Sequence, residues 1–285
     1  MPVVYVNGRI TDAASAVIPV FDHGFLYGEG VYETLRTYGG EPFLFDAHMR
    51  RLRRSGGMIH LDVPGTDDEM MKNIRETMAA EPGLKEAYIR ILITRGVGEL
   101  SYNLAATPVP STVIIVKPFP EPPAAHFTDG IALALVSVRR NHPSALNPRI
   151  KSNNLLNNAL AMQEALRQGA EEALRLNQQD EIAECSQSNF FIVKDGRALT
   201  PPLTAGLLPG ITREFVLEVA RDAGVPAEEH TLSTADMWAA DEAFITGTTR
   251  EITPVVKVDG RPFGDGRPGP ITRKLLETFR AKTRR

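Results

Sequence analysis

The chain has 285 residues with a formal net charge of −3, and 42% of its residues are hydrophobic and 24% charged. These are ordinary values for a globular protein, and they exclude an intrinsically disordered chain. The charge balance gives no global basic signal for nucleic acid. The longest apolar stretch, residues 131–138, is far shorter than the about 20 residues that span a bilayer.

The single cysteine, Cys185, excludes an internal disulfide framework and favours a reducing compartment. The first residues lack the basic-then-apolar pattern of a signal peptide. We therefore expect a cytoplasmic protein with no nucleic-acid or membrane partner. The six histidines show no metal-ligand spacing with the cysteine, so no metal site is expected.

The first half of the chain predicts hairpins followed by helices and strands. Asn7-Gly8 predicts a hairpin over residues 3–10, and Gly39-Gly40 predicts a second one between 31–38 and 42–45. A helix is expected over 48–59 with Asp46 as its N-cap, and another over 66–80. Two short β-branched runs, 87–94 and 112–117, predict strands.

Four prolines within residues 118–123 predict an interdomain linker, because proline is excluded from helix interiors and sheet centres. The expected domains are residues 1–118 and 129–285, joined by a linker over 119–128. The second domain is expected to contain strands over 131–138, 181–184, 190–193 and 242–246, and helices over 153–168, 212–223, near residue 234 and at the C-terminus. Ser152 or Asn153 is the expected N-cap of the helix over 153–168. This mixture predicts two α/β or α+β domains with mixed sheets.

Two residues suggest chemistry when they are considered with their neighbours. Lys151 stands just ahead of a predicted helix, where a positive charge is electrostatically disfavoured and a neutral, nucleophilic amine is favoured. Glu184 ends an acidic strand beside a very apolar one, and a buried carboxylate there needs a positive partner. Each residue alone also fits a structural role, as a surface lysine or a capping acid.

Three further segments could bind an anion. Pro209-Gly210 opens a predicted helix, so the free amides of Ile211 and Thr212 favour phosphate. The segment 247–253 is rich in small hydroxyl residues and could form an anion nest. Arg51, in a helical run of arginines, could bind phosphate through two parallel hydrogen bonds. A lysine amine, a buried glutamate and anion-binding turns are together the parts that pyridoxal 5′-phosphate requires.

Over nearly its whole length the sequence resembles the class IV aminotransferases, which are pyridoxal-phosphate enzymes of fold type IV. The resemblance is carried by Arg149-Ile-Lys-Ser-Asn-Asn-Leu-Leu, Ala183-Glu-Cys-Ser-Gln-Ser-Asn-Phe-Phe, His48-Met-Arg-Arg-Leu, Leu208-Pro-Gly-Ile-Thr-Arg and Gly247-Thr-Thr-Arg-Glu-Ile-Thr-Pro. It implies an α/β (α+β) fold of two mixed-sheet domains with the cofactor between them. It also implies a homodimer and transfer of the amino group by double displacement.

The resemblance also assigns roles to single residues. It implies that Lys151 forms the Schiff base and that Glu184 pairs with the pyridine nitrogen. Leu208 would lie against the ring face. The residues implied at the phosphate are Arg51, Ile211, Thr212 and Thr248, and the Thr248 and Thr249 amides would be available to the substrate carboxylate.

Substrate preference divides the family, and the sequence carries signals in two directions. Tyr88 and Arg90 lie in a segment that resembles one of the branched-chain aminotransferases, and Tyr27 and Arg36 also match those enzymes. These matches favour an L-branched-chain or other apolar amino acid as donor and a 2-oxo acid as acceptor. Tyr32 and Thr34 instead resemble the D-amino acid enzymes, although the R-x-H carboxylate trap of those enzymes is missing after residue 96. A D-amino acid or (R)-amine transaminase is therefore the alternative, and a 4-amino-4-deoxychorismate lyase, which would release pyruvate without an acceptor, is a further one.

Overall fold

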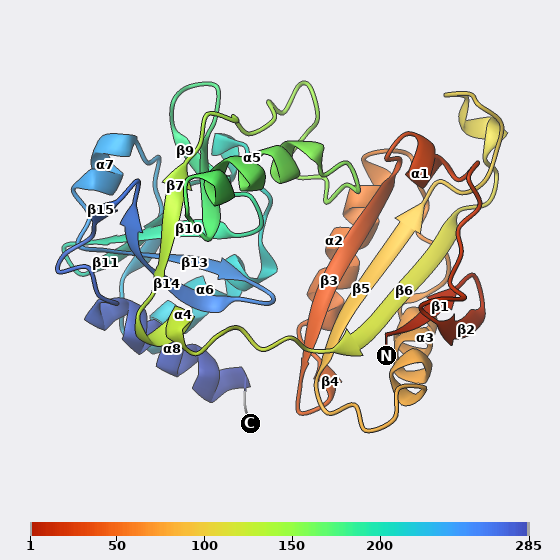
Figure 1. Ribbon diagram of the computed structural model, residues 1–285, viewed down its shortest axis with the longest axis horizontal. Coiled ribbons are helices and arrows are strands. Elements are labelled where there is room, and N and C mark those ends of the chain that lie inside the picture. The colour runs from red at the N-terminus through yellow and green to blue at the C-terminus, as the bar shows by residue number, and fades with distance from the viewer. Residues whose placement is uncertain (1, 284–285) are drawn as a thin grey trace. The chain divides into compact units, whose positions relative to one another are not determined.

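The computed structural model describes residues 2–283, which divide into two compact units (Figure 1). Unit 1 comprises the chain up to Pro120 together with Ile150–Asn154, and unit 2 comprises Glu121–Arg149 and the chain from Leu155 onward. The segment around Lys151, which the sequence analysis assigns to the second domain, thus groups with unit 1. The domain boundaries expected at 118 and 129 remain a prediction.

Unit 1 contains a six-stranded antiparallel sheet in the order β2-β1-β6-β5-β3-β4. The strands are β1 (Val3–Val6), β2 (Arg9–Asp12), β3 (Gly30–Tyr38), β4 (Glu41–Pro42), β5 (Ala87–Thr94) and β6 (Ser111–Pro118). The helices are α1 (His23–Leu26), α2 (Phe45–Gly57) and α3 (Asp67–Ala79), with a 3₁₀ turn over Leu104–Ala106. One core forms where α2 and α3 bury Met49, Leu52 and Ile74 against Leu35 and Ile89 of the sheet.

Unit 2 contains a nine-stranded mixed sheet in the order β12-β11-β10-β13-β14-β7-β8-β9, with β15 beside β14. The strands are β7 (Ile131–Leu135), β8 (Glu172–Leu176), β9 (Ile182–Cys185), β10 (Asn189–Lys194), β11 (Arg197–Thr200), β12 (Ala227–Glu229), β13 (Glu242–Gly247), β14 (Glu251–Val258) and β15 (Arg261–Pro262). The helices are α4 (Ala125–Thr128), α5 (Leu156–Arg167), α6 (Ile211–Asp222), α7 (Thr234–Trp238) and α8 (Pro270–Thr283), with a 3₁₀ turn over Leu203–Ala205.

Small residues and aromatic rings pack the helices of unit 2. Ala161 and Ala165 of α5 lie against Ala134 and Ala173, so the helix that connects the parallel strands β7 and β8 covers them closely. Phe215 of α6 meets Phe279 of α8 edge to face. Within residues 2–283, no helix combines the length and the apolar character needed to cross a membrane.

The fold class and most expected elements are confirmed. The Asn7-Gly8 hairpin is present with Val6 opposite Arg9, and both turn residues have positive φ, as a two-residue hairpin loop requires. The helix over 66–80 also appears, because Thr66 and Glu69 form a reciprocal capping box at its start. The second hairpin has only a two-residue return strand, β4, in place of 42–45.

Two expected caps are wrong. Helix α2 begins after Leu44, which has φ 52° and no capping side chain, and Asp46 lies within its first turn. Helix α5 begins only after Leu155, also without a side-chain cap. Ser152 does not cap it because its hydroxyl accepts from the Asn154 amide and its backbone pairs with β3.

Candidate active site

The segment that carries Lys151 is fixed in unit 1 by its main chain. The carbonyl of Lys151 accepts from the Tyr32 amide at 2.9 Å, and its amide donates to Ser55 Oγ at 3.1 Å. Ser152 forms an antiparallel bridge with Val31. The segment Ile150–Asn154 therefore lies as a short added strand beside the start of β3, and Lys151 is placed without any hydrogen bond from its own amine.

A glycine permits this close approach. Gly30, at the start of β3, accepts through its carbonyl from the Asn153 amide at 2.9 Å. A Cβ added to Gly30 would overlap Asn153 Nδ2 and would lie 2.7 Å from the Ile93 carbonyl oxygen. Only a residue without a side chain therefore fits between the Lys151 segment and β5.

Of the residues expected to contact the substrate, those on β3 and β5 share one face of the unit 1 sheet. Alternate positions of β3 point away from the core, where their partners on β5 do the same. The side chains on this face include Tyr32, Thr34, Arg36, Tyr88 and Arg90. Tyr32 is central, because Lys151 Nζ lies 4.6 Å and the Arg90 guanidinium carbon 4.2 Å from its ring centre. Aromatic faces attract such cations.

The structure treats Arg36 and Tyr27 differently. Arg36 is buried and its guanidinium carbon stacks 4.1 Å from the ring centre of Tyr38 and 3.8 Å from that of Phe119. Tyr27 follows α1 and contacts the rings of His23 and of the exposed Tyr102. Tyr27 therefore belongs to the loop region around α1, whereas the other expected substrate residues of unit 1 lie on the strands.

Arg51 belongs to a buried charge cluster that the sequence analysis did not identify. Its Nε donates to Glu33 Oε1 at 2.6 Å, and a second nitrogen donates to Oε2 at 2.7 Å. His48 Nδ1 lies 2.7 Å from the same carboxylate. Burial alone would raise the pKa of Glu33, but the charges of Arg51 and His48 and their hydrogen bonds outweigh it and hold this pKa well below its ordinary value. Burial lowers the pKa of His48, against the opposing effect of Glu33.

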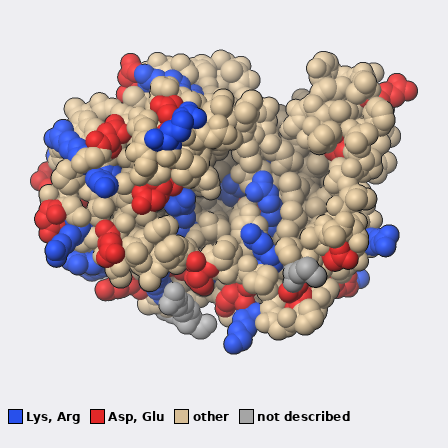
Figure 2. Space-filling model, viewed as in Figure 1, with Lys and Arg blue, Asp and Glu red and all other residues tan. Residues whose placement is uncertain are grey.

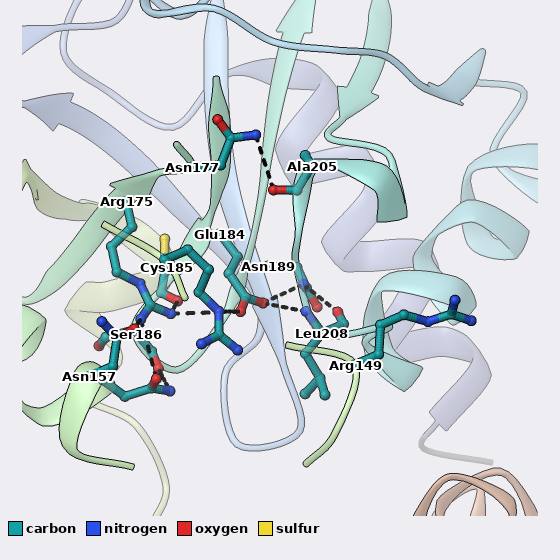
Figure 3. Close-up of polar contacts among 12 residues, drawn as sticks. Arg149, Asn157, Arg175, Asn177, Glu184, Cys185, Ser186, Asn189, Ala205 and Leu208 are labelled. Atoms are coloured by element: carbon teal, nitrogen blue, oxygen red, sulfur yellow. Dashed lines mark hydrogen bonds and ion pairs between the residues drawn. The ribbon is translucent and has the colours of Figure 1, made fainter. Parts of the chain in front are cut away.

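Glu184, in unit 2, is held by its own side chain. Its Oε1 accepts from Arg140 Nε at 2.6 Å, and its Oε2 accepts from the Leu208 amide at 3.1 Å and from Asn189 Nδ2 at 3.3 Å (Figure 3). Arg175 lies 3.7 Å away and is fully buried. These contacts satisfy the buried carboxylate with donors from a side chain of the same motif, a main-chain amide and two arginines.

Arg175 connects Glu184 to neighbouring elements. It donates to the Cys185 carbonyl at 2.8 Å and to Asn157 Oδ1 on α5 at 2.7 Å (Figure 3). Burial lowers the pKa of Arg175 to about 10, although Glu184 opposes this shift. The guanidinium therefore stays charged at neutral pH and supports the negative charge of Glu184.

The N-terminus of α6 is suited to an anion. Its N-cap, Gly210, offers no capping side chain, and Ile211 and Thr212 are buried. The first amides of a helix have no partner within the helix, so a buried and uncapped N-terminus requires an acceptor from elsewhere. Leu208, which would lie against the cofactor ring, is joined to Glu184 through its amide.

The turn between β13 and β14 contains the other expected anion-binding residues. Gly247 pairs with Glu251, so Thr248, Thr249 and Arg250 form the turn itself. Among the described residues, the buried hydroxyl of Thr246 just before this turn has no hydrogen-bond partner. An orphaned buried donor beside a partly buried, polar turn is consistent with an anion bound there.

A second buried carboxylate, Glu172, was also missed from sequence. It accepts from the hydroxyl and the amide of Ser186, and Arg250 lies 3.6 Å from it. Asn158 donates to the Ser186 carbonyl at 2.6 Å and accepts from Arg175 at 3.2 Å. A continuous set of buried and partly buried contacts thus runs within unit 2 from Glu184 to the turn of Thr248 and Thr249.

The residues present fit pyridoxal phosphate by the chemistry of their donors. Unit 1 supplies an amine and a buried arginine, at Lys151 and Arg51. Unit 2 supplies a buried carboxylate paired with arginines at Glu184, an uncapped helix N-terminus at Ile211 and Thr212, and the turn of Thr248 and Thr249. The space-filling view shows basic side chains exposed on each unit (Figure 2), but the arginines that hold Glu184 are buried.

Comparisons with known proteins agree with this chemistry. The sequence model of the family described as Amino-transferase class IV matches residues 30–258. A Methanocaldococcus jannaschii protein that carries the name of a branched-chain-amino-acid aminotransferase is 41% identical over 97% of this chain and 95% of its own length. The D-alanine aminotransferase of Staphylococcus haemolyticus is 33% identical over 98% of this chain and 97% of its own.

Solved structures extend the similarity to the fold. The branched-chain amino acid aminotransferase of Escherichia coli superposes with a TM-score of 0.94 at 33% identity, covering 99% of this chain and 94% of that one. The branched-chain amino acid aminotransferase of Thermobaculum terrenum, solved in its PLP-form, gives 0.87 at 29% identity, covering 99% and 94%. Since the family match spans most of the sequence and the relatives align over nearly all of it, this chain belongs to the class IV aminotransferases.

Proposed function

We propose that the protein is a pyridoxal-phosphate-dependent aminotransferase that moves the amino group of an apolar L-amino acid, such as a branched-chain one, to a 2-oxo acid. The observation that carries the cofactor assignment is Glu184, a buried carboxylate paired with Arg140 and Arg175 and joined to the turn that opens α6. When bound, the cofactor supplies a carbonyl that exchanges amino groups and a ring that stores electrons.

Each residue then has a distinct task. Lys151 would hold the cofactor through its amine and, when that amine is free, would move a proton at the substrate Cα. Glu184 would pair with the ring nitrogen, and Leu208 would lie against the ring. The phosphate is bound by Arg51, by the amides of Ile211 and Thr212, and by Thr248. The amides of Thr248 and Thr249 bind the substrate carboxylate, and Tyr27, Tyr32, Arg36, Tyr88 and Arg90 line the substrate pocket.

The substrate class is supported by the relatives. The M. jannaschii protein at 41% identity carries the name of a branched-chain-amino-acid aminotransferase, and the structures cited above have branched-chain enzymes as their subjects. Tyr88 and Arg90 lie on the sheet face with Tyr32, as a substrate pocket requires. We propose double displacement, in which the amino acid reacts fully before the oxo acid binds.

We also propose that the enzyme acts as a homodimer in the cytoplasm. Unit 1 exposes large apolar side chains at Val17, Phe25, Tyr102 and Val109, each more than two thirds exposed. The segments that carry them are linked, because Gly98 donates its amide to the Phe21 carbonyl. Exposed apolar patches of this kind mark protein interfaces. Sedimentation analysis that gave a monomer at working concentrations would contradict the dimer.

One half-reaction separates the two candidate substrate classes. The protein is loaded with pyridoxal phosphate, L-leucine or D-alanine is added without an acceptor, and the absorption of the bound cofactor is followed. We expect L-leucine to convert the bound cofactor to its amino form much faster than D-alanine does. No conversion by any amino acid would contradict the aminotransferase proposal.

A D-amino acid or (R)-amine transaminase is the second candidate. It is favoured by the 33% identity to D-alanine aminotransferase over 98% of the chain and by Tyr32 and Thr34 on the pocket face. Faster conversion by D-alanine in the same experiment would establish it.

A further inference from the structure

One buried amide side chain, that of Asn189, contacts two parts of unit 2 that have different tasks. Asn189 begins β10 opposite Thr246 of β13 and is 7% exposed. Its Nδ2 donates to Glu184 Oε2 at 3.3 Å and to the Leu208 carbonyl at 3.1 Å. In Figure 3 the side chain lies between these two residues.

The chemistry of the partners fixes the orientation of this amide. A carboxylate and a carbonyl oxygen only accept hydrogen bonds, so the group facing them must be the NH₂ of Asn189. The oxygen Oδ1 then faces Gly210. A Cβ added to Gly210 would overlap this oxygen.

Glycine is therefore required at position 210 because a larger residue would clash with Asn189. The φ of Gly210, −75°, is an ordinary value that any residue adopts, so its conformation does not call for glycine. Its position matters because it is the N-cap of α6, where the uncapped amides of Ile211 and Thr212 begin. Asn189 thus contacts the carboxylate of Glu184 on one side and the N-cap residue of α6 on the other.

We infer that Asn189 is a positioning residue that sets the separation between Glu184 and the N-terminus of α6, so that the ring nitrogen and the phosphate of the cofactor are bound together. This inference rests on the proposed function. Two binding groups held at a fixed separation bind a rigid ligand more tightly, because no ordering is needed on binding. Pyridoxal lacks the phosphate and uses only one of the two groups, so it gains less from the fixed separation.

The test compares pyridoxal phosphate with pyridoxal. The apoprotein is titrated with each compound, and the change in protein fluorescence gives the two affinities. For Asn189→Ala we expect the affinity for pyridoxal phosphate to fall about tenfold or more, because hydrogen bonds that involve a charged group are lost. The affinity for pyridoxal falls less, so the ratio of the two affinities decreases.

Asn177 provides a matched control. It is also a buried asparagine of unit 2, 6% exposed, and its Nδ2 donates to the Ala205 carbonyl at 3.2 Å and to Glu181 at 2.8 Å (Figure 3). Asn177→Ala removes a similar amide from a site away from Glu184 and Gly210. We expect Asn177→Ala to lower the melting temperature without changing the affinity ratio. If the role of Asn189 were merely structural, Asn189→Ala would give the same result.

A second variant tests the same contact from the other side. Gly210→Ala places a Cβ against Asn189 Oδ1 and is expected to lower the affinity ratio when Asn189 is present. In the double variant with Asn189→Ala the obstructing oxygen is gone, and we expect the affinities of Asn189→Ala alone. If Asn189→Ala does not fold, Gly210→Ala alone decides the matter.

The outcomes separate the inference from the proposed function. A wild-type protein that does not bind pyridoxal phosphate overturns the proposed function. A wild-type protein that binds it, with unchanged affinity ratios in the folded Asn189 or Gly210 variants, overturns the inference alone.

Discussion

Lys151 in unit 1 and Glu184 in unit 2 are placed by opposite means. Lys151 is held through main-chain hydrogen bonds with Tyr32 and Ser55, and its amine takes no part in this support. Glu184 is held through its carboxylate, which contacts Arg140, Asn189 and Leu208. An amine that must bind, release and move protons needs a free side chain on a fixed backbone. A carboxylate that must only hold a proton in place benefits from an immobile side chain.

The largest effect is expected from Lys151→Ala. Loss of the amine should lower the rate of the L-leucine half-reaction by about 10²–10⁴-fold or more, since it would remove the proposed attachment point and the proposed proton carrier together. The melting temperature should stay within a few degrees of the wild type, because the main-chain bonds remain. Lys85→Ala, at an exposed lysine of unit 1, serves as the control with unchanged rate. Wild-type turnover by Lys151→Ala would contradict the assignment.

Glu184→Ala should instead lower the free energy of unfolding. It leaves Arg140 and Arg175 buried without their carboxylate, and removing one partner of a buried ion pair costs about 3–5 kcal/mol. Urea denaturation followed by circular dichroism measures this loss. Glu184→Gln keeps the shape and isolates the charge. Equal stability of Glu184→Ala and Lys151→Ala would remove the difference between the two regions.

The sequence predicted what depends on neighbours along the chain. The Asn7-Gly8 hairpin and the helix over 66–80 were predicted from local patterns, and both are present. The caps by Ser152 or Asn153 failed because long-range contacts hold both residues: Ser152 pairs with Val31, and the Asn153 amide donates to Gly30. The cap by Asp46 failed because α2 begins after Leu44 and includes Asp46 in its first turn. Strands β8, β11, β12 and β15 were missed because their short runs are defined by their neighbours in the sheet. The eight-residue β14 was also missed, and its Pro254 argues against a strand in the sequence.

The site residues divide in the same way. Motif positions such as Lys151 and Glu184 could be named from sequence, and their roles remain predictions. The arginines that support Glu184, Arg140 and Arg175, could not be named, because they approach it only after folding. Asn189 lies within the same motif as Glu184, but its contact with the carboxylate is visible only in the structure. One signal was available for Glu33: in β3 it occupies the core-facing register of Val31 and Leu35, where a charge requires a buried partner.

A smaller effect should follow from changing the backbone support of Lys151. Gly30→Ala forces the Asn153 side chain or the Ile93 carbonyl to shift, and Lys151 moves with its segment. A displacement of about 1 Å can cost about 10²-fold in rate. Gly57→Ala is the matched control, since nothing lies within 4 Å of its added Cβ and its φ is not positive. Equal half-reaction rates for the two variants would show that the main chain does not position Lys151.

The buried charges of unit 1 should give a pH-dependent stability. His48 has a lowered pKa in the folded state, so the unfolded chain binds the proton first and stability falls as pH drops below about 6.5. Glu33 also has a lowered pKa, so its contribution is lost only as pH falls below about 4.3. The free energy of unfolding, measured by urea denaturation from pH 7 to 4, should decline less in His48→Gln between about pH 6.5 and 5, by up to about 1.4 kcal/mol per pH unit. The exposed His230→Gln should follow the wild type, and an unchanged slope in His48→Gln would contradict the assignment.

The smallest effect is expected at Cys185, which lies next to Glu184 and is fully buried. Burial raises the pKa of the Cys185 thiol, and only the thiolate reacts readily. Alkylation in the folded protein should therefore be slow and should report the opening of the Glu184 cluster. Lys151→Ala should leave this rate unchanged, since its segment belongs to unit 1, whereas Glu184→Ala should increase it. The rate of Cys185 alkylation is measured by mass spectrometry at one pH. An equal increase in both variants would mean that the two regions open together, so that the main-chain support of Lys151 and the side-chain support of Glu184 do not act independently.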